Sequence, residues 1–446
     1  MSSLRKQGSS IGYCWIPACA GMTIVLFKKT TLKNGLRVLT VPMAGTKTVT
    51  VLILVGTGSK YETKEISGIS HFLEHMFFKG TKKRPDPAKI VEELDRIGGE
   101  YNAFTSKENT GFYAKVNYEN LDLALDWISD IFLNSKFNAK EIEKEKGVIV
   151  EEINMYFDIP MHYVGYLWEE LLYGDQPAGW PVWGTKEVVT GLGREQFINY
   201  WKSQYSAKNS LVCLAGNFEE KTALKKIEKY LGGFNGREYK NKQEVFENQK
   251  KQEVLIHYKK TDQTHLCLGV RGYDIFHKDR YVLSVLGTIL GGFMSSRLFQ
   301  EVRERQGLAY YIRTAVDSNT DNGYLVTQAG VANEKAEKAV KTILNEYKKI
   351  KNKKISADEL DKAKEHIKGN MLLNLETSDE LASFIAGQEI LKKEILTPEE
   401  VFRRIDKVSI DDIWRVAQNI FRPEKLNLAL IGPFKENKTF KALLEI

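Results

Sequence analysis

The two halves of the 446-residue chain carry the same order of strands and helices. In the first half, apolar runs that read as strands come early, helical patterns follow, and a buried strand over residues 211–215 comes late. The second half begins with strands at 254–257 and 266–270 and ends with a strand at 426–432 that matches the earlier one. This order is typical of an α+β domain, in which helices pack against one face of an antiparallel sheet. The sequence therefore predicts two α+β domains of similar, roll-like fold.

Composition suggests where these domains begin and end. Residues 240–253 are rich in Lys, Glu, Gln and Asn and are predicted to link an N-terminal domain, residues 27–239, to a C-terminal domain, residues 254–446. Residues 1–26 are predicted to be a disordered extension or the result of a mis-assigned start. The hydrophobic fraction is 42% and the charged fraction is 28%, which suits a globular protein with more than one core.

The N-terminal residues also bear on location. Arg5 and Lys6 precede an uncharged run that contains Ala18-Cys19-Ala20, as in a secretory signal over residues 1–20, which would make the protein periplasmic or exported. Glycines and a proline interrupt this run, which favours a cytoplasmic protein. The sequence contains no apolar run of about 18 residues, so no association with a membrane is expected.

Cysteine usage and charge argue against other classes. The four cysteines are too few and too scattered for a disulfide framework or a Cys-ligated metal; they are Cys14, Cys19, Cys213 and Cys267. The net charge is +7, but Lys and Glu are interspersed along helices rather than gathered in a basic block. Nucleic-acid binding is therefore not expected.

A metal site is predicted by His71, Glu74 and His75, which read H-x-x-E-H within an apolar helical pattern. On a helix, His75 lies about 40° from His71, and Glu74 lies about 60° away on the other side, so the three side chains share one face. A catalytic zinc ion takes three protein ligands and lowers the pKa of a bound water to about 7. We therefore expect one zinc ion per chain, with Glu74 as the general base and a third ligand elsewhere in the sequence.

The third ligand is expected in a second charged helix, residues 138–156, which contains Glu145, Glu151 and Glu152. Glu145 and Glu152 are seven residues apart, so they lie within about 20° of each other on a helix. Glu152 could complete a His, His, Glu set, with Glu145 orienting a ligand or the water. The alternative is a solvated helical face with Lys–Glu pairs. Spacing alone does not choose between Glu151 and Glu152.

These motifs resemble those of the insulinase and pitrilysin family of inverted zinc peptidases. The resemblance extends from about Phe27 onward. Its matching segments are His71–His75, residues 98–108, Glu145–Tyr156 and Trp180–Thr185. The resemblance is strongest to the short-chain branch, which includes mitochondrial processing peptidase and its bacterial relatives. In that family the third ligand follows an auxiliary Glu by seven residues, which implies Glu152 as the ligand and Glu145 as the auxiliary residue. The resemblance also implies a second domain that kept the fold but not the metal.

The resemblance further implies an Arg/Tyr element in the second domain. Arg303 and Tyr310 match an Arg and a Tyr that lie seven residues apart in the family, where they hold the substrate and the developing oxyanion. A phenol and a guanidinium can stabilise such a charge by a few kcal/mol. Tyr311 is an adjacent alternative to Tyr310.

The segment at residues 100–105 resembles the edge strand to which the family adds an extended peptide by main-chain hydrogen bonds. Asn102, Ala103 and Phe104 are the residues expected to bind substrate there.

The function expected from these features is a zinc-dependent metalloendopeptidase that cleaves extended or unfolded peptides inside a closed chamber. In the family, two halves of two domains each enclose the chamber, so the resemblance implies a homodimer, or else a heterodimer with an inactive paralogue. The alternative function is a non-catalytic, processing-peptidase-like subunit that binds peptides or supports a partner; a zinc hydrolase acting on other bonds is a third option. The complete set of His71, Glu74, His75 and Glu152 favours the enzyme.

Overall fold

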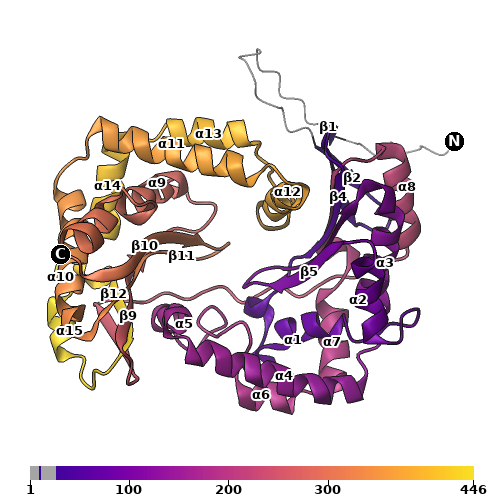
Figure 1. Ribbon diagram of the computed structural model, residues 1–446, viewed down its shortest axis with the longest axis horizontal. Helices are drawn as coiled ribbons and strands as arrows, with labels where there is room; N and C mark the ends of the chain where they lie inside the picture. Colours follow the sequence, from indigo (N-terminus) through magenta and orange to yellow (C-terminus); the bar gives the residue numbers. More distant parts are fainter. Residues whose placement is uncertain (1–9, 12–26) are drawn as a thin grey trace. The chain divides into compact units, whose positions relative to one another are not determined.

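The computed structural model describes residues 10–11 and 27–446, which form two compact units (Figure 1). The first unit comprises the chain up to Val150, Val182–Lys242 and Leu373–Pro398. The second comprises Glu151–Pro181, Gln243–Leu372 and Glu399–Ile446. Helix α4 (Ala139–Asp158) runs continuously through the first boundary. The expected signal over residues 1–20 and the expected extension over residues 1–26 lie outside the described residues, apart from Ser10 and Ile11.

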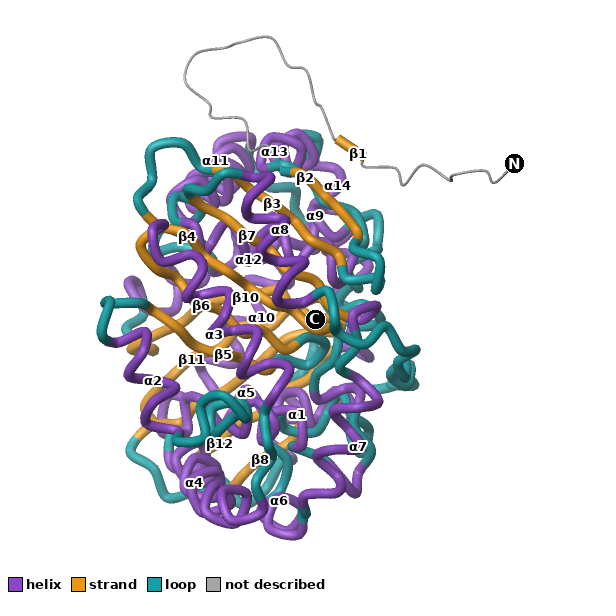
Figure 2. The backbone as a smooth tube through the Cα atoms, turned by 90° about the vertical axis from the view of Figure 1, so that its right-hand side faces the viewer, coloured by secondary structure: helices purple, strands orange, loops and turns teal. Residues whose placement is uncertain are grey.

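The first unit is built on a seven-stranded sheet with the strand order β1-β2-β3-β7-β4-β6-β5. The strands are β1 (Ser10–Ile11), β2 (Lys28–Thr31), β3 (Arg37–Pro42), β4 (Thr48–Val55), β5 (Glu100–Thr105), β6 (Thr110–Asn117) and β7 (Ser210–Gly216). The neighbours β3, β7 and β4 can be followed side by side in Figure 2. A turn at Gly35, whose φ is 92°, joins β2 to β3, as an Asn-Gly pair favours. The strand predicted to lie at the edge, β5, does so.

Helices cover both faces of this sheet. They are α1 (Ile69–Met76), α2 (Pro87–Asp95), α3 (Leu121–Asn134), α6 (Lys186–Gly191), α7 (Arg194–Gln204), α8 (Glu220–Leu231) and α12 (Ser378–Lys392). Leu381 and Ile385 of α12 pack on a sheet face formed by residues such as Leu39, Leu52 and Cys213. Figure 1 shows α3 and α8 on the opposite side of the sheet from α12. Burial on both faces explains why β4 and β7 are almost continuously apolar.

The second unit is built on a five-stranded sheet with the order β10-β11-β9-β12-β8. Its strands are β8 (Glu253–Tyr258), β9 (Gln263–Arg271), β10 (Ala309–Ser318), β11 (Gly323–Ala332) and β12 (Leu426–Gly432). The order is that of β5-β6-β4-β7-β3 in the first unit, and in both sheets the pair at the β3 or β8 end is parallel (β3 with β7, β8 with β12). The shared topology agrees with the repeated pattern in the sequence.

Helices also cover both faces of the second sheet. Besides the π-helical turn η5 (Phe299–Arg305), they are α5 (Pro160–Tyr173), α9 (Arg280–Gly291), α10 (Ala336–Asn352), α11 (Ala357–Asn374), α13 (Pro398–Asp406), α14 (Ile410–Ile420) and α15 (Lys438–Leu443). Val164, Leu167 and Trp168 of α5 pack against a sheet face that includes Cys267 and Val326. On α10, the Tyr347 hydroxyl donates to the Leu268 carbonyl oxygen at 3.0 Å. Figure 1 shows α5 and α10 on opposite sides of this sheet.

The α+β class with two sheet-plus-helix units is confirmed, but three expected details are wrong. Each sheet contains one parallel pair, so neither is purely antiparallel. Each sheet is covered on both faces rather than one, because α12 and α5 bury the second face. The domains are not continuous at 27–239 and 254–446, since α5 comes from the first half of the sequence and packs in the second unit, whereas α12 does the reverse. Among the described residues, no helix is both long and apolar enough to cross a bilayer.

Candidate metal centre

Helix α1 is fixed by burial of one apolar face. The residues of this face are completely or almost completely buried and recur at helical spacing; they are Ile69, Phe72, Leu73 and Met76. The Phe72 ring also makes an edge-to-face contact with Phe197 of α7, with centroids 4.7 Å apart. His71, Glu74 and His75 lie outside this apolar face and are half-buried, whereas the polar Ser70 is buried.

The start of α1 is held by a buried carboxylate from outside the helix. The N-cap residue, Gly68, has a φ of 94° and no side chain with which to cap the helix. Glu62 instead accepts hydrogen bonds from the backbone N–H of Gly68 at 2.7 Å and of Ser70 at 2.8 Å. Burial raises the pKa of Glu62 to about 8, although these hydrogen bonds act in the opposite direction. The Ser70 hydroxyl also lies 2.7 Å from the Tyr200 hydroxyl, which ties α1 to α7.

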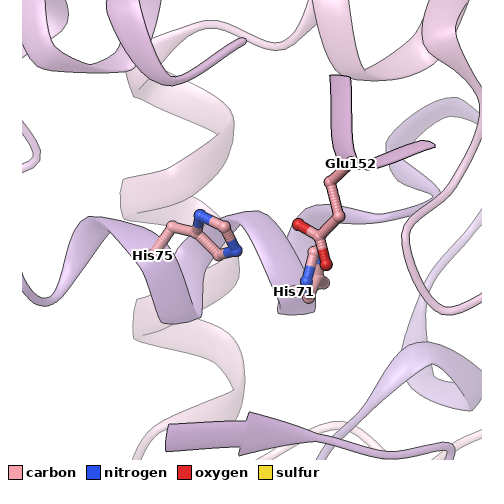
Figure 3. Close-up of side chains that lie close together, drawn as sticks. All are labelled: His71, His75 and Glu152. Atoms are coloured by element: carbon pink, nitrogen blue, oxygen red, sulfur yellow. The ribbon is translucent and has the colours of Figure 1, made fainter. Parts of the chain in front are cut away.

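His71 and His75 from α1 and Glu152 from α4 come together as a candidate metal-binding group (Figure 3). One ligand atom from each residue lies within 4.8 Å of the others, and all three residues are half-buried. The imidazole centroids are 4.7 Å apart. Among the described residues, this is the one group of three potential ligands that lie so close together.

The donor set fits zinc. Zinc binds His nitrogen and carboxylate oxygen at about 2.0–2.2 Å, so tetrahedral ligand atoms lie roughly 3.4 Å apart. Atoms within 4.8 Å of one another reach that separation by small side-chain rotations. Two His and one carboxylate also leave a fourth position open, as catalytic zinc sites do.

The structure distinguishes Glu151 from Glu152, the two candidates for the third ligand between which helical spacing did not choose. Glu151 is exposed, and one of its carboxylate oxygens accepts a hydrogen bond from Asn154 at 3.3 Å. Glu152 is half-buried beside the two histidines, and its Oε1 accepts a hydrogen bond from the Tyr156 hydroxyl at 3.2 Å. Tyr156 was missed in the sequence, although it lies four residues after Glu152 and therefore on the same helical face.

Glu145 contacts one of the histidines directly. Its Oε1 lies 3.0 Å from Nδ1 of His75, and its Oε2 accepts from Nζ of Lys79 at 2.7 Å. Burial alone would raise the pKa of Glu145, but the hydrogen bonds from His75 and Lys79 outweigh it and leave the pKa lowered. The ionised carboxylate favours a proton on Nδ1 of His75, which leaves Nε2 to bind a metal.

Glu74 is linked to the edge strand. The hydroxyl of Thr105, the last residue of β5, donates to Oε2 of Glu74 at 2.6 Å. On the same strand, Oδ1 of Asn102 accepts from the backbone N–H of Ala103 at 2.9 Å. Asn102 and Phe104 are exposed and Ala103 is buried. The contact of Thr105 with Glu74 joins residues far apart in sequence and was not predicted.

The Arg/Tyr element lies in the second unit. Arg303, in η5, has its guanidinium 4.8 Å from the ring centroid of Phe299 and 6.0 Å from that of Tyr310. Tyr310 is the second residue of strand β10, and its side chain is 76% exposed. Tyr311 is half-buried instead, and its hydroxyl lies 3.0 Å from Nδ1 of His265. Tyr310 is therefore the more accessible phenol of the two.

Family comparisons match both halves of the chain. The family described as Insulinase (Peptidase family M16) matches residues 37–186, and the one described as Peptidase M16 inactive domain matches residues 191–367. The chain is similar to an uncharacterized zinc protease of Bacillus subtilis, with 38% identity over 92% of this chain and 98% of the relative. It is also similar to an uncharacterized zinc protease of Mycobacterium leprae, with 33% identity over 94% of each chain.

Solved structures agree with these matches. A protease from Helicobacter pylori superimposes with a TM-score of 0.87 and 25% identity, covering 92% of this chain and all of that one (100%). A peptidase M16 inactive domain from Pseudomonas fluorescens shares the fold with a TM-score of 0.84 at 17% identity, covering 92% of this chain and 98% of that one. The extent of the sequence match to curated relatives, together with the two family matches, shows that this chain belongs to the insulinase family, peptidase family M16.

Proposed function

We propose that the protein is a zinc-dependent metalloendopeptidase that cleaves extended or unfolded peptides. The observation that carries the proposal is the grouping of His71, His75 and Glu152, with Glu74 on the same helix. Membership of a family whose relatives are named zinc proteases supports it.

In this proposal His71, His75 and Glu152 hold the metal. A zinc ion there would supply Lewis acidity, which makes water a nucleophile near neutral pH. Glu145 keeps the His75 ring oriented and its Nδ1 protonated, and Lys79 keeps Glu145 ionised.

Glu74 acts as the general base in this proposal and later as the proton donor. It takes a proton from the attacking water and returns that proton to the leaving amine as the peptide bond breaks. The Thr105 hydroxyl holds one carboxylate oxygen of Glu74 at 2.6 Å. This hydrogen bond means that the carboxylate starts each cycle in one orientation.

The substrate is proposed to add to β5 as a further strand. Because β5 lies at the edge of its sheet, one row of its backbone groups is available for pairing. The backbone N–H of Ala103 on that strand donates to the side-chain oxygen of Asn102. A substrate carbonyl oxygen would replace Asn102 as the acceptor of this N–H. The exposed side chains of Asn102 and Phe104 would contact the peptide near the scissile bond.

Arg303 and Tyr310 are proposed to bind the substrate carbonyl and stabilise the oxyanion. Their mutual contact and the exposure of Tyr310 support a shared role. We propose that this element acts within a closed chamber formed by two copies of the chain, with a heterodimer as the alternative, and that the protein is cytoplasmic.

The alternative function is a non-catalytic subunit that binds peptides or supports a partner, and it is favoured by the match of residues 191–367 to an inactive domain. The first half of the chain retains the whole set of His71, Glu74, His75 and Glu152, which favours the enzyme.

Cleavage of a quenched fluorogenic peptide library by the wild type and by Glu74→Gln, each with its zinc content measured, tests the proposal. We expect turnover by the wild type that a chelator abolishes, and no turnover by a Glu74→Gln protein that still contains zinc. Stoichiometric zinc without turnover by the wild type would contradict the proposal and favour the binding subunit.

A further inference from the structure

A cavity of about 570 Å3 lies in the second unit, between α5 and the strands β10 and β11. Tyr166 and Glu169 from α5 line it, together with Tyr311, Arg313 and Gln328 from the two strands. The metal ligands, Glu74 and the Arg303–Tyr310 pair do not line this cavity.

Arg313 is held in one orientation beside this cavity. It faces Gln328 across the β10–β11 pair, and Oε1 of Gln328 accepts from Nε of Arg313 at 3.1 Å and from Nη2 at 2.8 Å. The amide nitrogen of Gln328 in turn donates to the Met161 carbonyl oxygen of α5 at 2.6 Å. Since Gln328 is buried and bonded on both sides, it acts as a fixed support for the guanidinium.

Glu169 also lines the cavity, but Arg313 forms no ion pair with it or with any other carboxylate in the part of the chain that the structure describes. The guanidinium bonds to an amide and forms no ion pair with a carboxylate, whereas Arg271 pairs with Glu247 and Arg297 pairs with Glu359. Only two of its five N–H donors are directed at Gln328. The remaining donors form the planar fork that matches a carboxylate.

The cavity is linked to Glu152, one of the three candidate metal ligands, through contacts on α4 and α5. The Tyr156 hydroxyl donates to Glu152, and the Tyr156 ring lies 6.0 Å from the ring of Tyr166, which lines the cavity. Tyr156 and Tyr166 therefore connect Glu152 to the cavity wall.

We propose that this cavity is a substrate subsite in which Arg313 binds a peptide carboxylate, either an acidic side chain or the C-terminal carboxylate. The proposal rests on the proposed function, because it takes the ligand to be a peptide substrate. It assigns the protein a preference for substrates with a negative charge near the cleaved bond.

Peptide binding in a Glu74→Gln background tests this subsite without any need for turnover. Fluorescence anisotropy would be measured with labelled peptides that differ in one group: an internal Glu against Gln, and a free C-terminus against an amide. We expect the preferred acid to bind about tenfold more tightly than its neutral counterpart, as a charge-assisted bidentate contact allows. The pair that shows the difference identifies the source of the carboxylate.

Three variants and one control locate the effect. Arg313→Gln is expected to remove the preference, Arg313→Lys to retain part of it, and Arg313→Glu to favour basic peptides instead. Arg422→Gln is the control, because Arg422 is also exposed, also bonds to an amide and also lies in the second unit. It is expected to leave the preference unchanged, which separates a local contact from the effect of overall charge.

Absence of an acid preference in the Glu74→Gln background, or a preference that survives Arg313→Gln, would overturn the subsite. The wild type could also fail to cleave any peptide while the binding preference still depends on Arg313. That outcome would count against the proposed peptidase and not against the subsite.

Discussion

The carboxylate of Glu145 lies 3.0 Å from Nδ1 of His75. This contact fixes which nitrogen of the His75 ring faces the metal-binding group, and Lys79 stabilises the negative charge that it requires. In the proposed metal centre, Glu145 would therefore act through His75, as a positioning residue.

We expect Glu145→Gln to weaken zinc binding about 10–100-fold, because outer ligands of this kind set the tautomer and basicity of the ligating imidazole. Competition with a chromogenic zinc chelator would measure the change. Glu143→Gln, which removes an exposed carboxylate paired with Lys146 on the same helix, is the matched control and should bind zinc as the wild type does. Equal affinities of the two variants would show that the contact with His75 has no such role.

Loss of the Thr105 hydroxyl is expected to lower kcat about tenfold, since Thr105→Val removes a hydrogen bond to the charged Glu74 carboxylate. KM should change little, because the hydroxyl is engaged by Glu74. Steady-state kinetics would measure both constants, and Thr105→Ser should restore kcat. A fall in activity caused entirely by KM would assign Thr105 to substrate binding instead.

The two adjacent tyrosines are expected to differ in their effect on kcat. Tyr310→Phe should lower kcat about 100-fold by removing an oxyanion donor. Tyr311→Phe removes a hydroxyl that contacts His265 and should leave kcat near that of the wild type. The opposite result would show that Tyr311 is the residue that acts at the site.

Glu62 predicts a specific dependence of stability on pH. Burial raises its pKa from 4.5 to about 8 in the folded state, so the folded state holds this proton more tightly than the unfolded state does. The contribution of Glu62 to the free energy of unfolding is therefore complete below pH 4.5 and falls as the pH rises to about 8. Glu62→Gln cannot titrate there.

Urea unfolding of the wild type and Glu62→Gln across this pH range would reveal the effect. The free energy of unfolding of the wild type, relative to that of the variant, should fall by a few kcal/mol between pH 5 and 8. A difference that is constant with pH would mean that the Glu62 carboxyl is ionised throughout.

The packing of α12 on the first sheet predicts a large loss of stability from Ile385→Ala. Ile385 is buried in the core that α12 shares with β4 and β7, so its truncation should cost about 2–5 kcal/mol. Leu373→Ala is the control, because Leu373 is 70% exposed. Thermal unfolding of both variants would show whether α12 is an integral part of the core, and equal melting temperatures would argue that it is not.

Local sequence patterns predicted much of this protein. The helices α1 and α4 were predictable because His71, Glu74 and His75 lie on an amphipathic pattern, and because Glu145 and Glu152 share a helical face. The edge position of β5 was predictable only through a resemblance, because an edge is a property of the whole sheet.

Contacts between distant segments were not predictable from local patterns. Strand β10 was missed because Tyr310, Arg313 and Asp317 interrupt its apolar residues, and an exposed edge strand tolerates such residues. Lys79 and Thr105 were missed because only the folded chain brings them to Glu145 and Glu74. The packing of α5 and α12 also depends on which sheet face remains uncovered. The sequences of these two helices do not indicate which face that is.

The exchange of α5 and α12 has a consequence for how the protein is made. All strands of the first sheet have been synthesised once translation has passed β7. Helix α12 is synthesised more than a hundred residues later. Until then the sheet face that contains Leu39, Leu52 and Cys213 has no cover and meets solvent or a chaperone. The first unit can therefore complete its folding only near the end of translation, and the two halves of the chain reach their native state together.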